Sequence, residues 1–161
     1  MDSVFIGKGK MAGKGVYAAR DFNKGELVKV YNLTLLTQTM YDALPENERM
    51  FVHSFWGKMY LFPEPSRYTN HSATPNTYSD VNQMCDYASR FIPQGEMITT
   101  NATIEVRKEL ETFVQALEGS SVSDFEWYRG GYRNARVRYT MNNKVKDLRL
   151  KRQAGNWRIV S

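Results

Sequence analysis

Short apolar runs bounded by turn residues dominate the first hundred positions of the chain, a pattern typical of β-strands. The runs predict strands at 26–36, 51–55, 58–62, 77–80 and 84–91. The stretch 37–50 instead predicts a helix, with Thr37 or Thr39 as its cap and Pro45 as an interruption. We therefore expect a β-rich region with one helical segment inserted between its strands.

The pattern changes in the last third of the chain. Between Ile104 and Leu117 the apolar residues return at helical spacing, and Gly119-Ser120-Ser121 ends the predicted helix. Strands are expected after it at 134–139, 144–152 and 157–160, with turns at 142–143 and 154–156. This change predicts a domain boundary near residue 103.

Two segments, 18–28 and 88–98, match each other at an offset of 70 residues. An alanine, an arginine and a Gly-Glu pair coincide, and apolar residues follow each Gly-Glu. Each copy predicts a strand, a tight turn and a second strand, because glycine supplies the positive φ that such turns need. The repeat therefore predicts two similar hairpins and internal pseudo-symmetry.

Length and charge limit the possible functions. The 161 residues suit one domain, or one domain with a small appendage. Acidic and basic residues balance up to residue 103, so the whole net charge of +5 lies in the last third. A basic surface attracts nucleic acid or acidic proteins, although a solvated basic face explains the same excess.

The sequence gives no reason to expect a membrane or secreted protein. No apolar run approaches the ~20 residues that span a bilayer, and the N-terminus lacks the basic start of a secretory signal. We therefore expect a cytoplasmic or nuclear protein without a membrane partner. A single cysteine, Cys85, excludes an internal disulfide and a cysteine-cluster zinc site.

The segment 67–76, Arg-Tyr-Thr-Asn-His-Ser-Ala-Thr-Pro-Asn, carries the most distinctive chemistry. Its Asn, Ser and Pro residues disfavour a helix, so it predicts a rigid loop that presents amides and an imidazole. Other site classes fit less well. The dinucleotide-binding spacing of Gly7, Gly9 and Ala12 is followed by a strand rather than a helix, and His53 and His71 are too few for a metal site.

Four motifs occur in a fixed order along the chain. They are Gly13-Lys14-Gly15-Val16-Tyr17-Ala18, Gly25-Glu26, Asn70-His71-Ser72-x-x-Pro75-Asn76 and Ile92-Pro93-x-Gly95-Glu96-x-Ile98-Thr99. With these motifs, residues 3–103 resemble the SET domain of protein-lysine methyltransferases. The resemblance implies a mainly β fold: a SET β-clip with a pseudoknot over 1–103, plus a small α+β appendage over 104–161.

The resemblance also implies S-adenosyl-L-methionine as the cofactor. The implied cofactor-binding residues are Gly13, Lys14, Gly15, Tyr17, Asn70 and His71. A plain hairpin turn would explain the glycines, and Asn70 and His71 could serve only to build the knot. Tyr60 and Tyr68 are implied for the cofactor or lysine pocket, although aromatic residues at strand spacing are also common in cores.

The chain departs from the family pattern at the catalytic position. The family usually continues Gly-Glu-x-hydrophobic-Thr-x-x-Tyr, and this chain has Ala102 where that tyrosine stands. Because the tyrosine orients the lysine amine, its loss is expected to slow methyl transfer rather than forbid it. Tyr128 or Tyr132 is an alternative source of a phenol. The family's cysteine-rich zinc segment is missing too, so 104–161 is expected to close the cofactor pocket.

The C-terminal part weakly resembles a fragment of the nuclear-transport-factor-like fold. Its basic residues Arg129, Arg133, Arg136 and Arg138 alternate with tyrosines. This spacing fits an acidic protein, nucleic acid or a second subunit in a homodimer, and it is equally typical of a solvated strand face.

Three functions remain after these observations. The leading hypothesis is an S-adenosylmethionine-dependent methyltransferase that acts on a lysine side chain of a protein substrate. The second is a non-catalytic SET module that binds cofactor or a partner, and Ala102 is the residue that separates the two. The third is a nucleic-acid-associated protein that acts through its basic C-terminal part.

Overall fold

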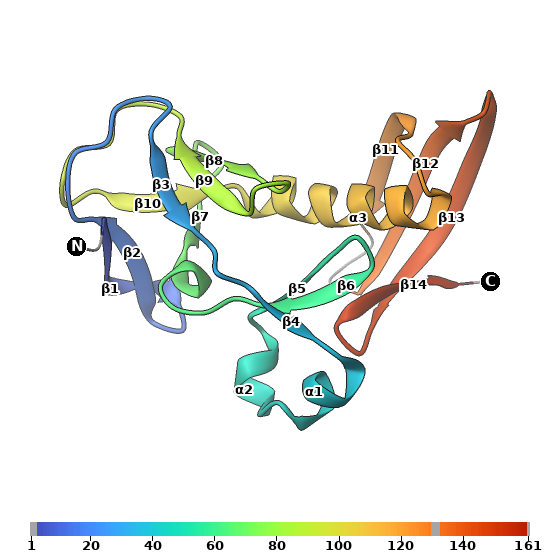
Figure 1. Cartoon of the computed structure of the whole chain (residues 1–161), viewed down its shortest axis with the longest axis horizontal. Helices are drawn as coiled ribbons and strands as arrows, with labels where there is room; N and C mark the ends of the chain where they lie inside the picture. The colour runs from blue at the N-terminus through green and yellow to red at the C-terminus, as the bar shows by residue number, and fades with distance from the viewer. Residues whose placement is uncertain (1–2, 130–132, 161) are drawn as a thin grey trace. The chain divides into compact units, whose positions relative to one another are not determined.

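A computed structural model describes residues 3–129 and 133–160 (Figure 1). Contacts between residues divide the chain into two compact units. Unit 1 comprises Met1–Thr34 with Phe62–Glu105, and unit 2 comprises Leu35–Leu61 with Val106–Ser161. Segment 35–61 thus groups with the C-terminal part, a division by contacts that differs from the predicted boundary near residue 103. The assignment of 1–103 and 104–161 as domains stays a prediction.

Unit 1 consists mainly of short strands in two sheets. Its elements are β1 (Val4–Met11), β2 (Lys14–Ala18), β3 (Leu27–Val30), η1 (Ser66–Tyr68), β7 (Asn70–His71), β8 (Thr77–Asp80), β9 (Cys85–Ala88) and β10 (Met97–Thr100). The first sheet has the order β1-β2-β10-β7 and the second the order β3-β9-β8. The expectation of a mainly β fold is confirmed, whereas the pseudoknot stays a prediction.

The two repeat segments pair with each other, so the prediction of two separate hairpins is wrong. Strand β2 of the first copy pairs with β10 of the second, and β3 pairs with β9. Between them Phe22 and Ile92 exchange two backbone hydrogen bonds of 2.8 Å, and both side chains are fully buried. Each copy alone would leave its apolar residues exposed, and burial against the other copy removes that cost.

The pairing keeps the pseudo-symmetry that the repeat predicts. Arg20 and Glu26 form an ion pair of 2.9 Å in the first copy, and Arg90 and Glu96 form the equivalent pair of 2.5 Å in the second. The backbone amide of Asn23 and the Arg20 guanidinium hold the pKa of Glu26 below its usual value. Because these pairs are exposed, they fix turn geometry more than they stabilise the fold.

Unit 2 contains the inserted segment and the C-terminal part. Its elements are α1 (Gln38–Ala43), α2 (Glu46–Arg49), β5 (Val52–Phe55), β6 (Lys58–Leu61), β11 (Ser123–Arg129), β12 (Asn134–Met141), β13 (Lys144–Gln153) and β14 (Asn156–Val160). Strand β4 (Thr34–Leu36) and helix α3 (Ala102–Glu118) cross from one unit to the other along the chain.

Three local differences from the sequence prediction have clear causes. The single strand predicted at 26–36 is divided into β3 and β4, where Asn32 adopts a φ of +54° that strands do not allow. The helix predicted at 37–50 is divided into α1 and α2 at Pro45, and the predicted Thr37 cap accepts a hydrogen bond from the Met40 amide. Strand β11 was not predicted.

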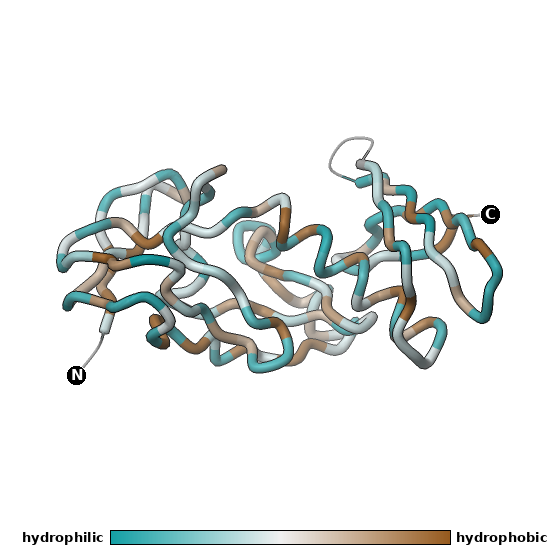
Figure 2. Tube along the Cα trace, turned by 90° about the horizontal axis from the view of Figure 1, so that it is seen from above, coloured by the Kyte–Doolittle hydropathy of each residue, from teal (hydrophilic) through white to brown (hydrophobic). Residues whose placement is uncertain are grey.

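Helix α3 packs its apolar face against the sheet β11-β12-β13-β14 (Figure 1). The buried cluster consists of Leu110, Val114, Ala135, Val137, Tyr139, Leu150 and Trp157. Strand β12 alternates between buried and exposed residues, as one covered face requires. Along the whole trace hydrophobic and hydrophilic positions intermix (Figure 2), and no helix in the described residues is long and apolar enough to cross a membrane.

A buried carboxylate joins α3 to the inserted segment. Glu109, on α3, accepts a hydrogen bond of 2.8 Å from the Ser54 amide of β5 and one of 2.6 Å from Arg152 of β13. His53 Nδ1 lies 3.4 Å from the same carboxylate. Burial alone would raise the pKa of Glu109, but His53, Arg152 and the Ser54 amide together lower it below its usual value.

Removal of the chain after Thr103 should unfold the inserted segment. The Ser54 amide would lose Glu109, and the Trp56 amide would lose the Thr112 hydroxyl that it now reaches at 2.9 Å. We expect a 1–103 fragment to aggregate and to lack a cooperative thermal transition, measured by light scattering and circular dichroism. A soluble 1–103 fragment as stable as the whole chain would contradict this dependence.

Glu109→Gln should cost about 3–5 kcal/mol of unfolding free energy at pH 7, because it removes one partner of a buried ion pair. Since the folded pKa of Glu109 lies below its usual 4.5, its contribution is present above that value and is lost as pH falls through the folded pKa. Denaturant unfolding between pH 3 and pH 7 measures both effects. The control is Glu111→Gln on the same helix, whose exposed pair with Arg107 should contribute little. Equal losses from both variants would contradict the assignment.

Candidate functional site

The side chain of Asn70 is the centre of the predicted site in unit 1. This buried amide accepts a hydrogen bond of 2.7 Å from the Lys10 backbone N–H. Its nitrogen donates to the carbonyl oxygens of Lys14, at 2.9 Å, and Tyr68, at 2.8 Å. One amide therefore ties the β1–β2 turn to the segment that leads into β7.

The glycine-rich turn is close to Asn70 on one side and open on the other. A Cβ on Gly15 would lie 3.3 Å from the Asn70 amide nitrogen and 3.2 Å from the Lys8 carbonyl oxygen, so a larger residue would press on both. Gly13 has a φ of +80° and nothing within 4 Å of the place where its Cβ would stand. The structure thus leaves bare backbone accessible at Gly13 and needs a small residue at Gly15.

Lys14 and Tyr17 lie on the same strand with different environments. The Lys14 ammonium lies 4.8 Å from the centre of the Tyr68 ring, a cation–π contact. The Tyr17 hydroxyl donates to the Lys8 carbonyl oxygen, and its ring stacks on Phe5 at 5.6 Å. Tyr17 therefore fastens β1 to β2, and its role in cofactor binding stays a prediction.

His71 is exposed and receives a hydrogen bond at the start of α3. The Ala102 backbone N–H donates to His71 Nδ1 at 2.9 Å, so Nδ1 must be unprotonated in this arrangement. Asn101 caps the same helix, because its side-chain oxygen accepts from the Thr103 amide at 3.0 Å. The imidazole therefore joins the Asn-His segment to the first residue of α3.

Strand β10 is fixed between these groups. It pairs in parallel with β7, with Thr99 opposite Asn70 and Thr100 opposite His71. The buried Asn76 amide donates to the Met97 carbonyl at 2.8 Å and accepts from the Thr99 amide at 2.9 Å. Asn76 thus acts as a strand-like partner for β10.

The two predicted pocket tyrosines belong to different units. Tyr68 is buried in unit 1, where its hydroxyl donates to the Glu64 carboxylate at 3.0 Å. Tyr60 lies on β6 of unit 2, and its ring centre is 6.3 Å from that of Phe55. A common pocket of Tyr60 and Tyr68 stays a prediction.

Sequence reasoning missed a buried polar cluster in unit 1. Asp86, fully buried on β9, accepts hydrogen bonds from Lys29 at 2.7 Å, from Ser79 at 2.8 Å and from the Tyr31 hydroxyl. Burial and the Asp86 charge raise the pKa of Tyr31, which keeps its phenol protonated. Lys29, Ser79 and Asp86 lie on β3, β8 and β9, and Tyr31 directly follows β3, so only a known strand pairing could have brought them together.

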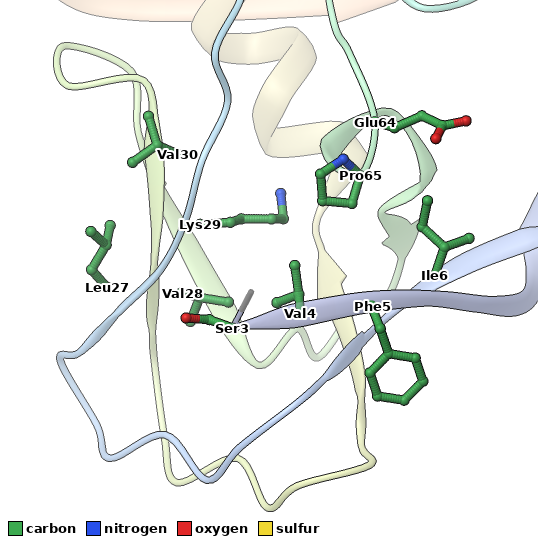
Figure 3. A pocket seen from close by; sticks show the side chains of 10 residues that line it. All are labelled: Ser3, Val4, Phe5, Ile6, Leu27, Val28, Lys29, Val30, Glu64 and Pro65. Carbon is green, nitrogen blue, oxygen red and sulfur yellow. The ribbon is translucent and has the colours of Figure 1, made fainter. Parts of the chain in front are cut away.

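A cavity of about 740 Å³ opens beside this cluster, between β1, β3 and the segment at Pro65. Figure 3 shows Lys29 extending from β3 toward Val4 and Pro65. None of the six predicted cofactor residues is among the ten that Figure 3 draws around it. Apolar side chains make up most of its lining, and Ser3, Lys29 and Glu64 are the polar ones.

The predicted basic strand is partly neutralised. Arg136 and Arg138 both contact Asp147, at 2.8 and 3.1 Å, and the two guanidinium groups lower the pKa of this carboxyl to about 2. Arg133 is exposed. The side chain of Arg129 and the whole of Tyr132 lie outside the described residues, and Tyr128 is exposed on β11 of unit 2. Binding of nucleic acid or an acidic protein at the four arginines stays a prediction.

The groups in the Gly13–Gly15 turn and the Asn70–His71 segment suit binding rather than acid–base chemistry. They are backbone N–H and carbonyl groups, an amide, an exposed imidazole and an ammonium held by a ring. Such groups can recognise a polar ligand through hydrogen bonds. The Gly13–Gly15 turn and the Asn70–His71 segment form a rigid cradle, so little conformational entropy is lost when a ligand binds.

Comparison with known proteins gives consistent results. Residues 13–101 match the SET domain family. Histone-lysine N-methyltransferase 2D of Homo sapiens and that of Mus musculus are each 26% identical over 61% of this chain, a region that spans only 2% of their own length. A structure of ctPRC2, in an autoinhibited conformation bound to S-adenosylmethionine, aligns with 73% of this chain and with 17% of the ctPRC2 chain. The sequence identity is 21% and the TM-score is 0.52. A structure of a humanized mutant of Chaetomium thermophilum Polycomb Repressive Complex 2 aligns with 62% of this chain and with 15% of its own chain. The sequence identity is 25% and the TM-score is 0.49.

Proposed function

Because the chain belongs to the SET domain family, we propose that it binds S-adenosylmethionine beside Asn70 and transfers a methyl group to a lysine side chain of a protein. The observation that carries this proposal is the Asn70 amide, which holds the Gly13–Gly15 turn against the Asn-His segment. The names of the curated relatives, which are histone-lysine methyltransferases, support the same reaction class.

The residues present fit such a cofactor. Gly13 offers an open backbone, and Gly15 leaves room that a Cβ would fill against Asn70. The backbone of His71 and the loop that follows it are fixed by the pairing with β10, where the Ser72 amide donates to the Thr100 carbonyl at 2.8 Å. S-adenosylmethionine supplies an activated methyl group on a sulfonium centre when it is bound.

The chain's own task is to align an uncharged amine. The lysine ammonium, with a pKa near 10.4 in water, loses its proton to solvent, which a dry site and a nearby positive charge favour. The backbone around Gly13 and the Asn70–His71 segment would hold the cofactor, which would supply its methyl group to the free lone pair of that amine. Alignment and exclusion of water carry this reaction, so a general base is not essential.

The first residue of α3 weakens this alignment. Ala102 is exposed, and it presents only a backbone N–H, which His71 receives. Slow or narrowly selective methyl transfer follows from the missing phenol. The same observation supports a second candidate function, a SET module that binds cofactor or a protein partner without chemistry. A protein substrate, a nuclear or cytoplasmic location and homodimerisation remain predictions.

Cofactor binding should depend on Asn70. Asn70→Ala removes the bonds to Lys10, Lys14 and Tyr68 that order the glycine turn, so S-adenosylmethionine binding would have to order it and should weaken about tenfold. Isothermal titration calorimetry measures the affinity, and circular dichroism checks folding. Asn82→Ala changes an exposed asparagine and serves as the control. Unchanged affinity in a folded Asn70→Ala protein would refute the role of Asn70, and no binding to the wild type at millimolar cofactor would refute the proposed function.

A phenol at position 102 should increase methyl transfer. Misalignment of about 1 Å costs roughly a hundredfold in rate, so Ala102→Tyr should recover part of that factor. Ala102→Phe is the matched control, since it adds the ring without the hydroxyl. The assay is radiolabelled methyl incorporation into histones and a cell lysate. Strong wild-type activity that Ala102→Tyr abolishes would show that another group fills this space. If all three proteins bind cofactor but incorporate no methyl group, the non-catalytic module is favoured.

A further inference from the structure

Unit 2 contains a polar cavity of about 400 Å³ with a strongly basic wall. It lies between α1, α2 and the end of β13 with its turn into β14. Four cationic residues line it, namely Arg49, Arg133, Lys151 and Arg152. Among the lining residues Asp42 is the acidic one, and its carboxylate already accepts a hydrogen bond of 3.0 Å from Gln38.

The shape of this cavity is built by close packing rather than by loose loops. A Cβ on Gly155 would lie 2.6 Å from the Tyr41 ring and 2.9 Å from the Met59 sulfur, so the glycine lets the β13–β14 turn approach α1. Arg152 is fixed by its 2.6 Å contact with Glu109 and lies over the Trp157 ring at 4.8 Å. The cationic wall is therefore rigid on the side of β13.

Two contacts fix the side chain of Arg49 and leave one of its N–H donors without an acceptor among the described residues. Its guanidinium lies 5.1 Å from the Tyr41 ring centre and donates to the Asp42 backbone carbonyl at 3.0 Å. Its Nε atom is buried and has no hydrogen-bond acceptor in the described part of the chain. A buried donor of this kind costs free energy until an acceptor reaches it.

Arg133 and Lys151 add charge that the described residues do not neutralise. Both side chains are exposed, and no carboxylate in residues 3–129 or 133–160 forms an ion pair with either. The Arg133 carbonyl accepts the Arg152 amide at 2.7 Å, which fixes its backbone beside the cavity. This differs from Arg136 and Arg138, which share Asp147.

We propose that this cavity binds a phosphate monoester. Guanidinium groups match the oxygens of a phosphate in a planar, two-bond geometry, and a lysine adds a point charge. The volume suits a ligand of small-molecule size. A concave site with its cations gathered around one space receives a single phosphate group, whereas a nucleic-acid backbone needs cations spread along a groove.

Calorimetric titration of the full chain with inorganic phosphate, phosphoserine and adenosine monophosphate tests the proposal. At least one of the two esters should bind more tightly than inorganic phosphate, and the one preferred identifies the source of the group. Lys151→Gln and Arg49→Gln should each weaken binding about tenfold, the loss of one charge-assisted hydrogen bond. Arg136→Gln, whose arginine is held by Asp147, should leave binding unchanged.

Lys151 is exposed, so its variant stays informative even if Arg49→Gln fails to fold. No binding of any of the three probes at millimolar concentration would overturn the proposal. An equal loss from Arg136→Gln would overturn it too, because it would indicate attraction to overall charge. Binding of a single-stranded oligonucleotide alone, with an affinity that falls steeply with salt, would replace the proposal with a nucleic-acid surface.

Discussion

The cross-pairing of the two repeat segments is the constraint on which the candidate site depends. Strand β10 follows the second Gly-Glu pair, and it can lie beside β2 only because the two copies exchange partners. The other edge of β10 then receives β7, which carries Asn70 and His71. A slip of one residue in the β2–β10 register would turn every side chain of β10 to the opposite face and detach Asn76 from it.

This arrangement explains how a short polar segment becomes a rigid site. Asn70 alone could not hold the glycine turn, because an exposed amide gains little from exchanging water for protein hydrogen bonds. Buried at 4% exposure and fixed by β10, it makes three such bonds with fixed partners. The turn at Gly13 and Gly15 is thus ordered before any ligand arrives, which lowers the entropic cost of binding.

Local patterns in the sequence predicted most elements but not their partners. The 3.6-residue spacing identified α3, and the turn residues identified the limits of the strands from β12 to β14. The turns at Gly25-Glu26 and Gly95-Glu96 led to a prediction of hairpins, whereas the structure pairs the strands of one copy with those of the other. The sequence of such a turn does not reveal which strand its flanking strands pair with. Strand β11 was missed although Gly119-Ser120-Ser121 and Gly130-Gly131 flank its sequence, Ser-Asp-Phe-Glu-Trp-Tyr-Arg, because charged residues interrupt its apolar run. The Asp86 cluster and the cavity at Arg49 join residues distant in sequence, which only tertiary packing reveals.

The central claim is that the cradle beside Asn70 is where this protein holds S-adenosylmethionine, and residue-resolved chemical shifts test it most directly. Amide resonances of the isotope-labelled protein would be followed while the demethylated cofactor product is added. The account predicts that the largest changes fall at Gly13, Gly15, His71 and Ser72. Changes concentrated instead around Val4, Lys29 and Pro65, the cavity of Figure 3, would contradict it.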